Sequence, residues 1–357
     1  MSLNPRFNDK EMPLVSVLIF NYNYGRYLRE CVESVLSQTY DNVEIIFSDN
    51  ASEDNSWAIM NEYLQKYPDI ITITRNRRNF GVEANWLNCA ANARGKYYVS
   101  LCSDDALMPD FVGRCVNALE THHEAAFAMV HRMIIDENSN RVEEPPFYNR
   151  SCLISGPEQA AVYMMAAVNP SVSQIMYNKL KTTGKSPHGT HLGARWYASR
   201  IMDFNICCEY PIAYIKDPLL LHRLHFENDS FKAADDLMEV IGPYVLHHQF
   251  AYIASHSPDL IKVVERLQPA IIKLSNLCLR YSSRSLCNGD ERSALRYFHL
   301  AAAMCPDIKN ESVFSQLQEY WLTDDNNKLC IKEKLRAADN LITRSVSYEP
   351  PADSLDF

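Results

Sequence analysis

The first 125 residues alternate between two patterns of apolar positions. Nearly unbroken apolar runs, typical of strands that are buried on both faces, cover residues 15–20, 43–48, 70–74 and 97–102. After each run the apolar residues recur every three or four positions, which predicts helices over residues 26–38, 52–67, 84–91 and 109–123. Ser52 or Asp54 is the expected N-cap of the second helix.

A regular succession of strands and helices predicts an α/β fold. Residues 126–135 extend the pattern with another strand, residues 158–168 with a helix, and residues 211–230 with a strand and a polar loop. Successive parallel strands need right-handed crossovers. We therefore expect a doubly wound, mostly parallel sheet with helices on both faces.

The character of the chain changes near residue 231. Helical periodicity dominates from there on, and the tail over residues 345–357 is expected to be frayed. The sequence thus predicts a sheet-containing domain over residues 1–230 and a smaller helical domain over residues 231–357.

Composition and charge narrow the class of protein. The formal net charge of −9 argues against a nucleic-acid-binding protein. We find no secretory signal, and no apolar run approaches the ~20 residues that span a bilayer. None of the 11 cysteines forms a Cys-x-x-Cys motif, so we interpret them as buried free thiols of a cytoplasmic protein.

Polar side chains follow four of the predicted strands. Because the carboxyl ends of parallel strands meet at one edge of a sheet, where such folds bind ligands, these side chains are candidates for one site. They are Asn21, Tyr22 and Asn23, then Asp49 and Asn50, then residues 75–81, and last Ser103, Asp104 and Asp105.

The adjacent acids Asp104 and Asp105 point to a bound cation. No Gly-x-Gly-x-x-Gly, Walker-type loop or Gly-x-Ser-x-Gly elbow occurs in the chain, which disfavours dinucleotide, NTPase and serine-hydrolase chemistry. Two carboxylates at a strand end suit a hard divalent cation, Mn2+ or Mg2+, that leaves positions open for a substrate phosphate.

Three blocks of the chain resemble family 2 glycosyltransferases of the GT-A fold. They are "PLVSVLIFNYNYGRYLRECVESVLSQTYDNVEIIFSDNASEDNS", "NFGVEANWLNCAANARGKYYVSLCSDDALMPDF" and "DPLLLHRLHFENDS". The resemblance implies a transfer of sugar from a nucleotide diphosphate donor, usually a UDP-sugar, to a hydroxyl of a saccharide or lipid-linked glycan. It also implies metal dependence and inversion at the anomeric carbon.

The resemblance also implies roles for single residues. Phe20, Asn21, Tyr22 and Asn23 would line the nucleotide, and Asp49 would hold its base. Arg78, Asn79 and Gly81 would border the ribose and diphosphate. Asp104 would face ribose or metal, Asp105 would bind the metal, and His225 would add a metal or diphosphate contact. Cys102 stands where many relatives have a third acid.

The catalytic base is less clearly marked than the metal site. An inverting transferase needs a carboxylate that takes the proton of the acceptor hydroxyl. Alignment on Trp196 puts Arg195 at that position, and an arginine cannot act as a base, whereas alignment on the following strand favours Asp203. Glu209 is the substitute that we rank below Asp203.

Two other classes of function stay open from the sequence alone. A degenerate transferase domain would bind nucleotides as a scaffold without turnover. A sugar-nucleotide pyrophosphorylase would share the sheet and the metal, although it normally has a Gly-rich loop after the first strand. The helical region is a candidate for binding the acceptor, for homo-oligomer formation or for peripheral attachment at the inner face of a membrane.

Overall fold

The computed structural model describes residues 12–165, 170–184, 198–225, 237–339 and 347–357. They form two compact units. The first unit contains the described residues up to Gln159, those between 170 and 225, and residues 347–357. The second unit contains residues 160–165 and 237–339, so the division differs from the predicted one at residues 160–165 and at the C-terminal tail.

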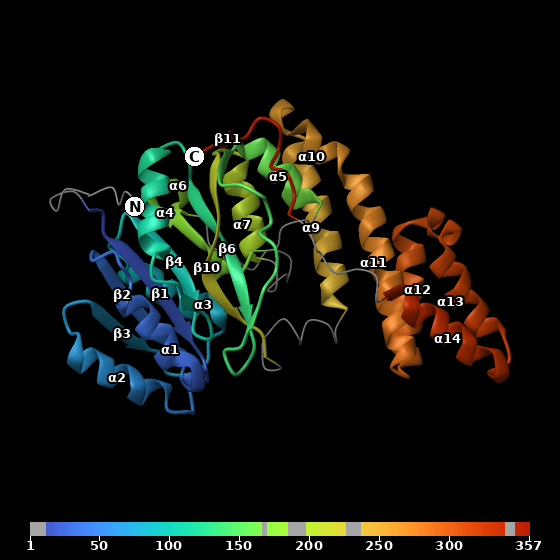
Figure 1. Ribbon diagram of the computed structural model, residues 1–357, viewed down its shortest axis with the longest axis horizontal. Coiled ribbons are helices and arrows are strands. Elements are labelled where there is room, and N and C mark those ends of the chain that lie inside the picture. Colours follow the sequence, from blue (N-terminus) through green and yellow to red (C-terminus); the bar gives the residue numbers. More distant parts are fainter. Residues whose placement is uncertain (1–11, 166–169, 185–197, 226–236, 340–346) are drawn as a thin grey trace. The chain divides into compact units, whose positions relative to one another are not determined.

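One mixed sheet forms the centre of the first unit (Figure 1). Its strands are β1 (Val15–Asn21), β2 (Val43–Asp49), β3 (Ile71–Arg75), β4 (Tyr97–Cys102), β5 (Ala106–Leu107), β6 (Phe127–Ile135), β7 (Arg141–Val142), β8 (Cys152–Ile154), β9 (Ile175–Asn178), β10 (Ile212–Arg223) and β11 (Leu355–Asp356). The order along the sheet is β11-β8-β10-β6-β9-β4-β1-β2-β3, with β5 beside β10 and β7 beside β6.

Most of the long strands run in the same direction. β4, β1, β2 and β3 pair in parallel, and so do β6 and β10. The short strand β9 is antiparallel to both β4 and β6 and joins these two parallel groups. The chain moves from β1 outward to β3 and then returns to β4 on the other side of β1. The strand order therefore reverses between β1 and β4, where such sheets bind ligands.

Helices cover both faces of this sheet. The described helices of the first unit are α1 (Gly25–Leu36), α2 (Ser56–Lys66), α3 (Val82–Asn92), α4 (Phe111–Thr121), the first residues of α5 (Gly156–Met164), the 3-10 turn η1 (Val172–Gln174), α6 (Lys179–Thr182) and α7 (Ala198–Cys207). Residues of α1, α2 and α4 share one apolar core with Val15, Val17 and Ile19 of β1. On the opposite face, Trp86 of α3 contacts Tyr98 of β4.

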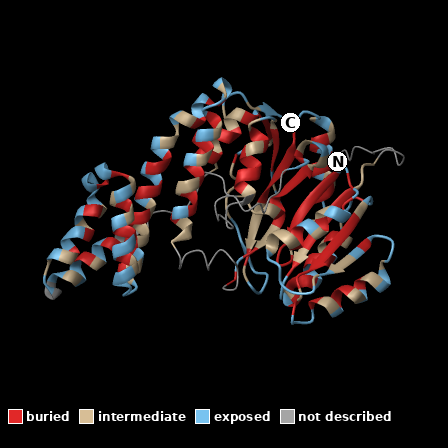
Figure 2. Cartoon of the chain, turned by 180° about the vertical axis from the view of Figure 1, so that it is seen from behind, coloured by how far each residue is buried: buried red, intermediate tan, exposed pale blue. Residues whose placement is uncertain are grey.

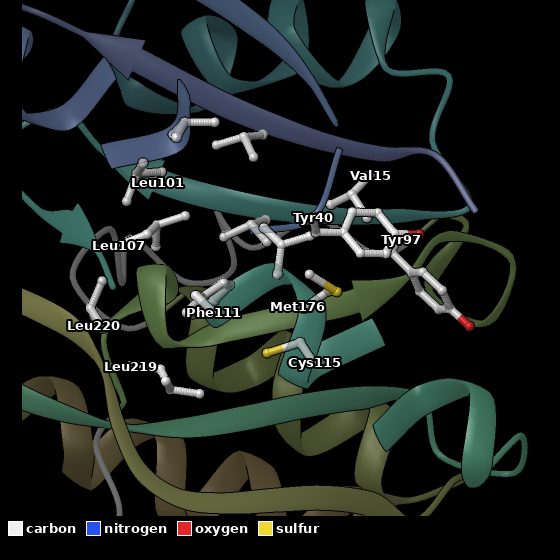
Figure 3. Close-up of a cluster of buried hydrophobic side chains, with 14 of the residues drawn as sticks. Val15, Tyr40, Tyr97, Leu101, Leu107, Phe111, Cys115, Met176, Leu219 and Leu220 are labelled. Atoms are coloured by element: carbon white, nitrogen blue, oxygen red, sulfur yellow. The ribbon is translucent and has the colours of Figure 1, made fainter. Parts of the chain in front are cut away.

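The main apolar core lies between the sheet and α1, α2 and α4. Figure 3 shows part of it, with Leu101, Leu107 and Phe111 close together near one end and Val15, Tyr40 and Tyr97 near the other. Figure 2 shows the sheet strands as largely buried, while the outward sides of the helices are exposed. The expected α/β fold with helices on both faces is confirmed.

Two local expectations were wrong, and one strand was missed. The tail is not frayed over its described part, because β11 pairs with β8 and Tyr348 forms a bridge with Tyr148. The strand β9 was not expected at all, since its four residues carry no clear periodicity. The N-cap of α2 is Asn55, although Asp54 accepts hydrogen bonds from the Ser56 backbone and hydroxyl.

The second unit is helical where it is described. Its elements after α5 are α9 (Met238–Ala254), η4 (Pro258–Leu260), α10 (Ile261–Glu265), α11 (Leu267–Cys287), α12 (Glu291–Met304), η5 (Pro306–Asn310), α13 (Ser312–Leu322) and α14 (Asp325–Asp339). They surround a core of their own, in which the rings of Phe298 and Phe314 stack at 4.5 Å. Among the described helices of the chain, none has the length and apolar character needed to cross a bilayer.

Candidate active site

The acid pair lies at the carboxyl end of β4, as the strand pattern predicts. Asp105 is 1% exposed, and its Oδ1 accepts the backbone N–H of Arg223 and lies against His222 Nδ1, each at 3.0 Å. Burial favours a raised pKa for Asp105, but the charge and hydrogen bond of His222, with the Ser173 and Arg223 contacts, outweigh it and lower the pKa. Asp105 is therefore held as a carboxylate.

Asp104 has a different environment although it is the next residue. Its Oδ2 lies 3.2 Å from His225 Nε2. Burial raises the pKa of Asp104, and the negative charge of Asp105 adds to this effect, while the His225 contact opposes it. The imidazole of His225 is itself buried, and its ring centroid lies 5.6 Å from that of Tyr24 and 5.0 Å from that of Tyr27.

A buried arginine holds the acid pair in place. Arg223 is 1% exposed, and its Nε donates to the backbone carbonyl of Asp104 at 2.9 Å. Its terminal nitrogens reach Glu30 at 2.6 Å and both the Asp136 carbonyl and the Ser139 hydroxyl. Its guanidinium also lies over the ring of Tyr27, at 4.7 Å. Neither Arg223 nor His222 was among the site residues predicted from the sequence.

The donor atoms at this end of β4 fit a divalent cation. The Sγ of Cys102 and one carboxylate oxygen each of Asp104 and Asp105 all lie within 4.8 Å of one another. Burial, followed by the charges of Asp105 and Asp104, raises the pKa of the Cys102 thiol well above its usual range. Cys102 is thus a neutral neighbour, and the two carboxylates are the hard donor groups of this cluster. His225 contacts this group through Asp104.

Asp49 ends β2 and organises the neighbouring loop. Its carboxylate has no exposed surface and pairs with Arg75 Nε at 3.1 Å. It also accepts the backbone N–H of Ser52 at 3.0 Å and an amide hydrogen of Asn21 at 3.3 Å. The structure places Asp49 at the ligand edge, with its oxygens already engaged by three groups of the protein. Its predicted contact with the base of a nucleotide stays a prediction.

The amide of Asn50 ties the β2 edge to the segment before α3. Its nitrogen donates to Asn79 Oδ1 at 2.7 Å and to the Gly81 carbonyl at 3.1 Å. Its oxygen accepts from Asn76 Nδ2 and from the Phe80 backbone. Asn79 and Gly81, two predicted diphosphate neighbours, are therefore fixed to the same edge as the acid pair. The sequence offered Asn50 only as a strand-end polar residue.

The remaining predicted nucleotide contacts also lie at this edge. Asn21 pairs in register with Asp49, and Phe20 with Cys102. Asn23 adopts a left-handed φ of 61° and binds the β2–α2 loop through Ser52 and Glu53. Tyr22 is 40% exposed. Arg78 is exposed, and its guanidinium lies over the ring of Phe80 at 4.9 Å.

Asp203 is not brought together with these residues. It lies in α7, 2% exposed, and accepts a hydrogen bond of 2.8 Å from Tyr177 on β9. Tyr177 pairs with Tyr98, which precedes Cys102 by four residues, or about 13 Å of strand. Burial raises the pKa of Asp203 to about 7, against the Tyr177 hydrogen bond and the charge of Arg200. This geometry gives the predicted base no contact with the acid pair.

The substitute candidate, Glu209, is no closer. Glu209 precedes β10, whose opposite end carries Arg223, so about 36 Å of strand separates it from the acid pair. Arg195 and Trp196 lie outside the described residues. The acceptor base is therefore not assigned by the described side chains.

A mostly parallel sheet with an acid pair beside its switch point is the arrangement expected of the GT-A fold. The comparison with family models agrees, because residues 16–177 match the model described as Glycosyl transferase family 2. Over these residues the chain matches that family, and the resemblance seen in the sequence is confirmed.

Relatives share the sequence of this domain. The chain is 30% identical over 194 residues to chondroitin synthase of Escherichia coli, covering 50% of this chain and 28% of that protein. It is 39% identical over 111 residues to the UDP-Glc:alpha-D-GlcNAc-diphosphoundecaprenol beta-1,3-glucosyltransferase WfaP of E. coli, covering 31% and 43%. The chain thus spans less than half the length of either relative.

Solved structures share the fold. TarS 1-349 of S. aureus in complex with UDP-GlcNAc matches with a TM-score of 0.57 and 13% identity, over 96% of this chain and 99% of that one. A mannosyltransferase of Pyrobaculum calidifontis in complex with GDP-Man and Mn2+ matches with a TM-score of 0.50 and 13% identity, over 93% and 88%. At these identities the likeness concerns the fold alone.

Proposed function

We propose that this chain is a metal-dependent, inverting glycosyltransferase that uses a nucleotide diphosphate sugar, a UDP-sugar, as its donor. The acceptor is a hydroxyl of a saccharide or lipid-linked glycan. The observation that carries the proposal is the placement of Asp105 as a buried carboxylate beside the edge formed by Asn21, Asp49 and Asn79. WfaP, whose printed name specifies UDP-Glc and a diphosphoundecaprenol acceptor, supports the donor and acceptor classes.

Asp104 and Asp105 are the residues that would hold Mn2+ or Mg2+. A divalent cation bound there neutralises the negative charge that builds up on the departing nucleotide diphosphate. The protein contributes a rigid frame for its ligands. His222 and the Arg223 backbone fix Asp105, while the Arg223 side chain fixes the Asp104 carbonyl. Such a frame lowers the cost of ordering the ligand residues when donor and cation bind.

In this proposal the donor binds to the domain predicted over residues 1–230, at the loops after β1, β2, β3 and β4. Asp203 is the base candidate from the sequence, and its burial beneath β9 argues for a structural role instead. That placement favours a second candidate function, a nucleotide-binding module without turnover. The two candidates share donor binding and differ only in transfer.

Thermal unfolding in the presence of ligands tests the proposal. A ligand that binds only the folded chain raises the unfolding midpoint by mass action. We expect UDP and UDP-sugars to raise it in Mn2+ and to lose most of that effect in EDTA, with GDP as the matched control. Equal shifts in Mn2+ and EDTA would refute the metal role, and the absence of any nucleotide shift would refute donor binding.

Transfer then separates the two candidate functions. Release of UDP from the stabilising donor, measured with saccharide and lipid-linked acceptors, is expected for a transferase. Binding without UDP release for every acceptor would favour the non-catalytic module.

A further inference from the structure

A cavity of about 420 Å³ lies among the helices of the second unit, and none of the residues assigned a role above lines it. α11 supplies one wall, and α13 and α14 contribute Val313 and Leu335. Most of the lining side chains are apolar, including Leu274 and Leu277. A volume of this size is within the range of small-molecule sites. An apolar wall of this kind favours a hydrocarbon ligand.

Two cations of α11 border the same cavity. Lys273 and Arg280 are seven residues apart, which places both on one side of the helix, with Leu277 between them. Arg280 is half-buried, and Lys273 is exposed. Among the described residues Glu311 is the one acid that lines the cavity, so the formal charges of these lining side chains sum to a positive value.

Lys273 has no acidic partner among the described residues. Its Nζ donates to the Met165 carbonyl at 3.2 Å, and no described carboxylate lies within 4.0 Å of it. Loss of hydration around the ammonium lowers the pKa of Lys273. A cation in this setting gains from an added anion, because an ion pair restores the interactions that desolvation removes.

We propose that the helical unit binds a single-chain amphiphile with a phosphate head group. The hydrocarbon chain occupies the cavity beside Leu274, Leu277 and Leu335, and the phosphate lies between Lys273 and Arg280. An ammonium and a guanidinium together suit a phosphate, which offers several acceptor oxygens. This inference does not rest on the proposed transferase function.

Calorimetric titration of the full chain with dodecyl phosphate tests the site. We expect one equivalent to bind below the concentration at which the amphiphile aggregates. Dodecanol should bind more weakly by a factor of about ten or more, because it lacks the charge-assisted contacts. Inorganic phosphate should give no measurable heat, because it leaves the apolar walls unfilled.

Two variants separate the head group from the chain. Lys273→Met should weaken dodecyl phosphate about tenfold and leave dodecanol unchanged. Leu277→Phe should weaken both by filling the cavity. Lys309→Met, an exposed lysine of the same unit that does not line the cavity, is the matched control and should bind as the wild type does.

A flotation experiment identifies the source of the ligand. Phosphatidylcholine vesicles that contain phosphatidic acid should retain the chain in a Lys273-dependent manner if the ligand is a membrane lipid. Binding of dodecyl phosphate without vesicle retention would identify a free amphiphile, and both results support the site. The proposal is overturned if dodecyl phosphate does not bind, or if it binds equally to the wild type, Lys273→Met and Leu277→Phe.

Nucleotide binding provides an independent control. Lys273→Met should leave the UDP-dependent rise of the unfolding midpoint unchanged, since the cavity and the acid pair belong to different units. A failure of the amphiphile site therefore leaves the transferase proposal untouched, and the reverse also holds.

Discussion

Asp105 and Asp203 are both buried acids of the sheet-containing unit, and their pKa values move in opposite directions. Asp105 has His222 at 3.0 Å and a backbone N–H at the same distance, and its pKa is lowered. Asp203 has one hydrogen bond, from a neutral tyrosine, and burial raises its pKa to about 7. Burial alone therefore does not decide the charge of an acid; its partners do.

The difference separates a cation site from a structural acid. A carboxylate that is kept charged at a sheet edge can hold a divalent cation, and only through that cation can it favour a bound diphosphate. An acid whose pKa is near 7 beneath a sheet is half neutral at physiological pH, and its hydrogen bond to Tyr177 connects α7 with β9. The experiments below ask whether the two acids differ in function as they differ in environment.

The largest effect is expected at Asp105. Asp105→Asn keeps the size of the side chain but removes the charge that holds a divalent cation, so turnover should fall by about 10²-fold or more. Sugar transfer measured against Mn2+ concentration checks this. Asp69→Asn, an exposed acid in a turn, is the control and should keep full activity. An Asp105→Asn variant as active as the wild type would end the metal assignment.

Arg223 is expected to matter most for stability. Arg223→Met removes the guanidinium from a buried set of acceptors and leaves the Asp104 and Asp136 carbonyls without that donor. Loss of one partner from such a buried network typically costs about 3–5 kcal/mol of the free energy of unfolding. Urea denaturation measures it. Glu30→Gln, which changes only the half-exposed partner, should cost about 1 kcal/mol or less. Equal losses in the two variants would contradict this view of Arg223.

At Asp203 we expect an effect on pH-dependent stability. The folded-state pKa of about 7 exceeds the usual value of ~3.9 for an unfolded chain, so folding is favoured at low pH. This contribution is fully present below pH ~4 and is lost as the pH rises through 7, at about 1.4 kcal/mol per pH unit.

Asp203→Asn removes that ionisation. Relative to the wild type, the variant should gain about 2–3 kcal/mol of stability between pH 5 and pH 8. Denaturation at both pH values measures this gain. If Asp203 is the catalytic base predicted from the sequence, Asp203→Asn should instead lower turnover by about 10²–10⁴-fold. We expect turnover to change little; a large loss with unchanged donor binding would restore Asp203 as the base.

The sequence predicted the parallel half of the sheet because that half is locally encoded. Each of β1, β2 and β4 is a buried apolar run, and the next helix along the chain has one apolar side. The strands β9 and β11 are too short to have a period, and β11 gains its partner β8 from about 200 residues earlier in the chain. Pairing over such a separation leaves no local pattern.

The candidate site shows the same limit. Asp104 and Asp105 were predicted because strand ends of a parallel sheet share an edge. Arg223 and His222 were missed, since their contacts with the acid pair depend on the register of β10 against β5 and β6. A charged residue that continues the apolar run "PLLLHR" was the available signal. The placement of Asp203 was missed because Tyr177 lies on the unexpected strand β9.

The smallest effect is expected at Ala51, in the loop beside Asp49. Three of the four described non-glycine residues with positive φ, namely Asn23, Ala51 and Ser139, belong to loops that hold the ligand edge or contact Arg223. Ala51 has φ of 61°, a conformation that costs an alanine roughly 1–2 kcal/mol, whereas glycine adopts it freely. The greater entropy of glycine in the unfolded chain offsets part of the gain, so Ala51→Gly should stabilise the chain by about 0.5–1 kcal/mol.

Gly81→Ala, at φ of 90°, is the converse control and should destabilise the chain. Both changes are measured by urea denaturation. A loss of stability in Ala51→Gly would show that the backbone of this loop is not strained. Backbone strain would then not distinguish the ligand edge from the region around Asp203, and the charge of the acids would be the remaining difference.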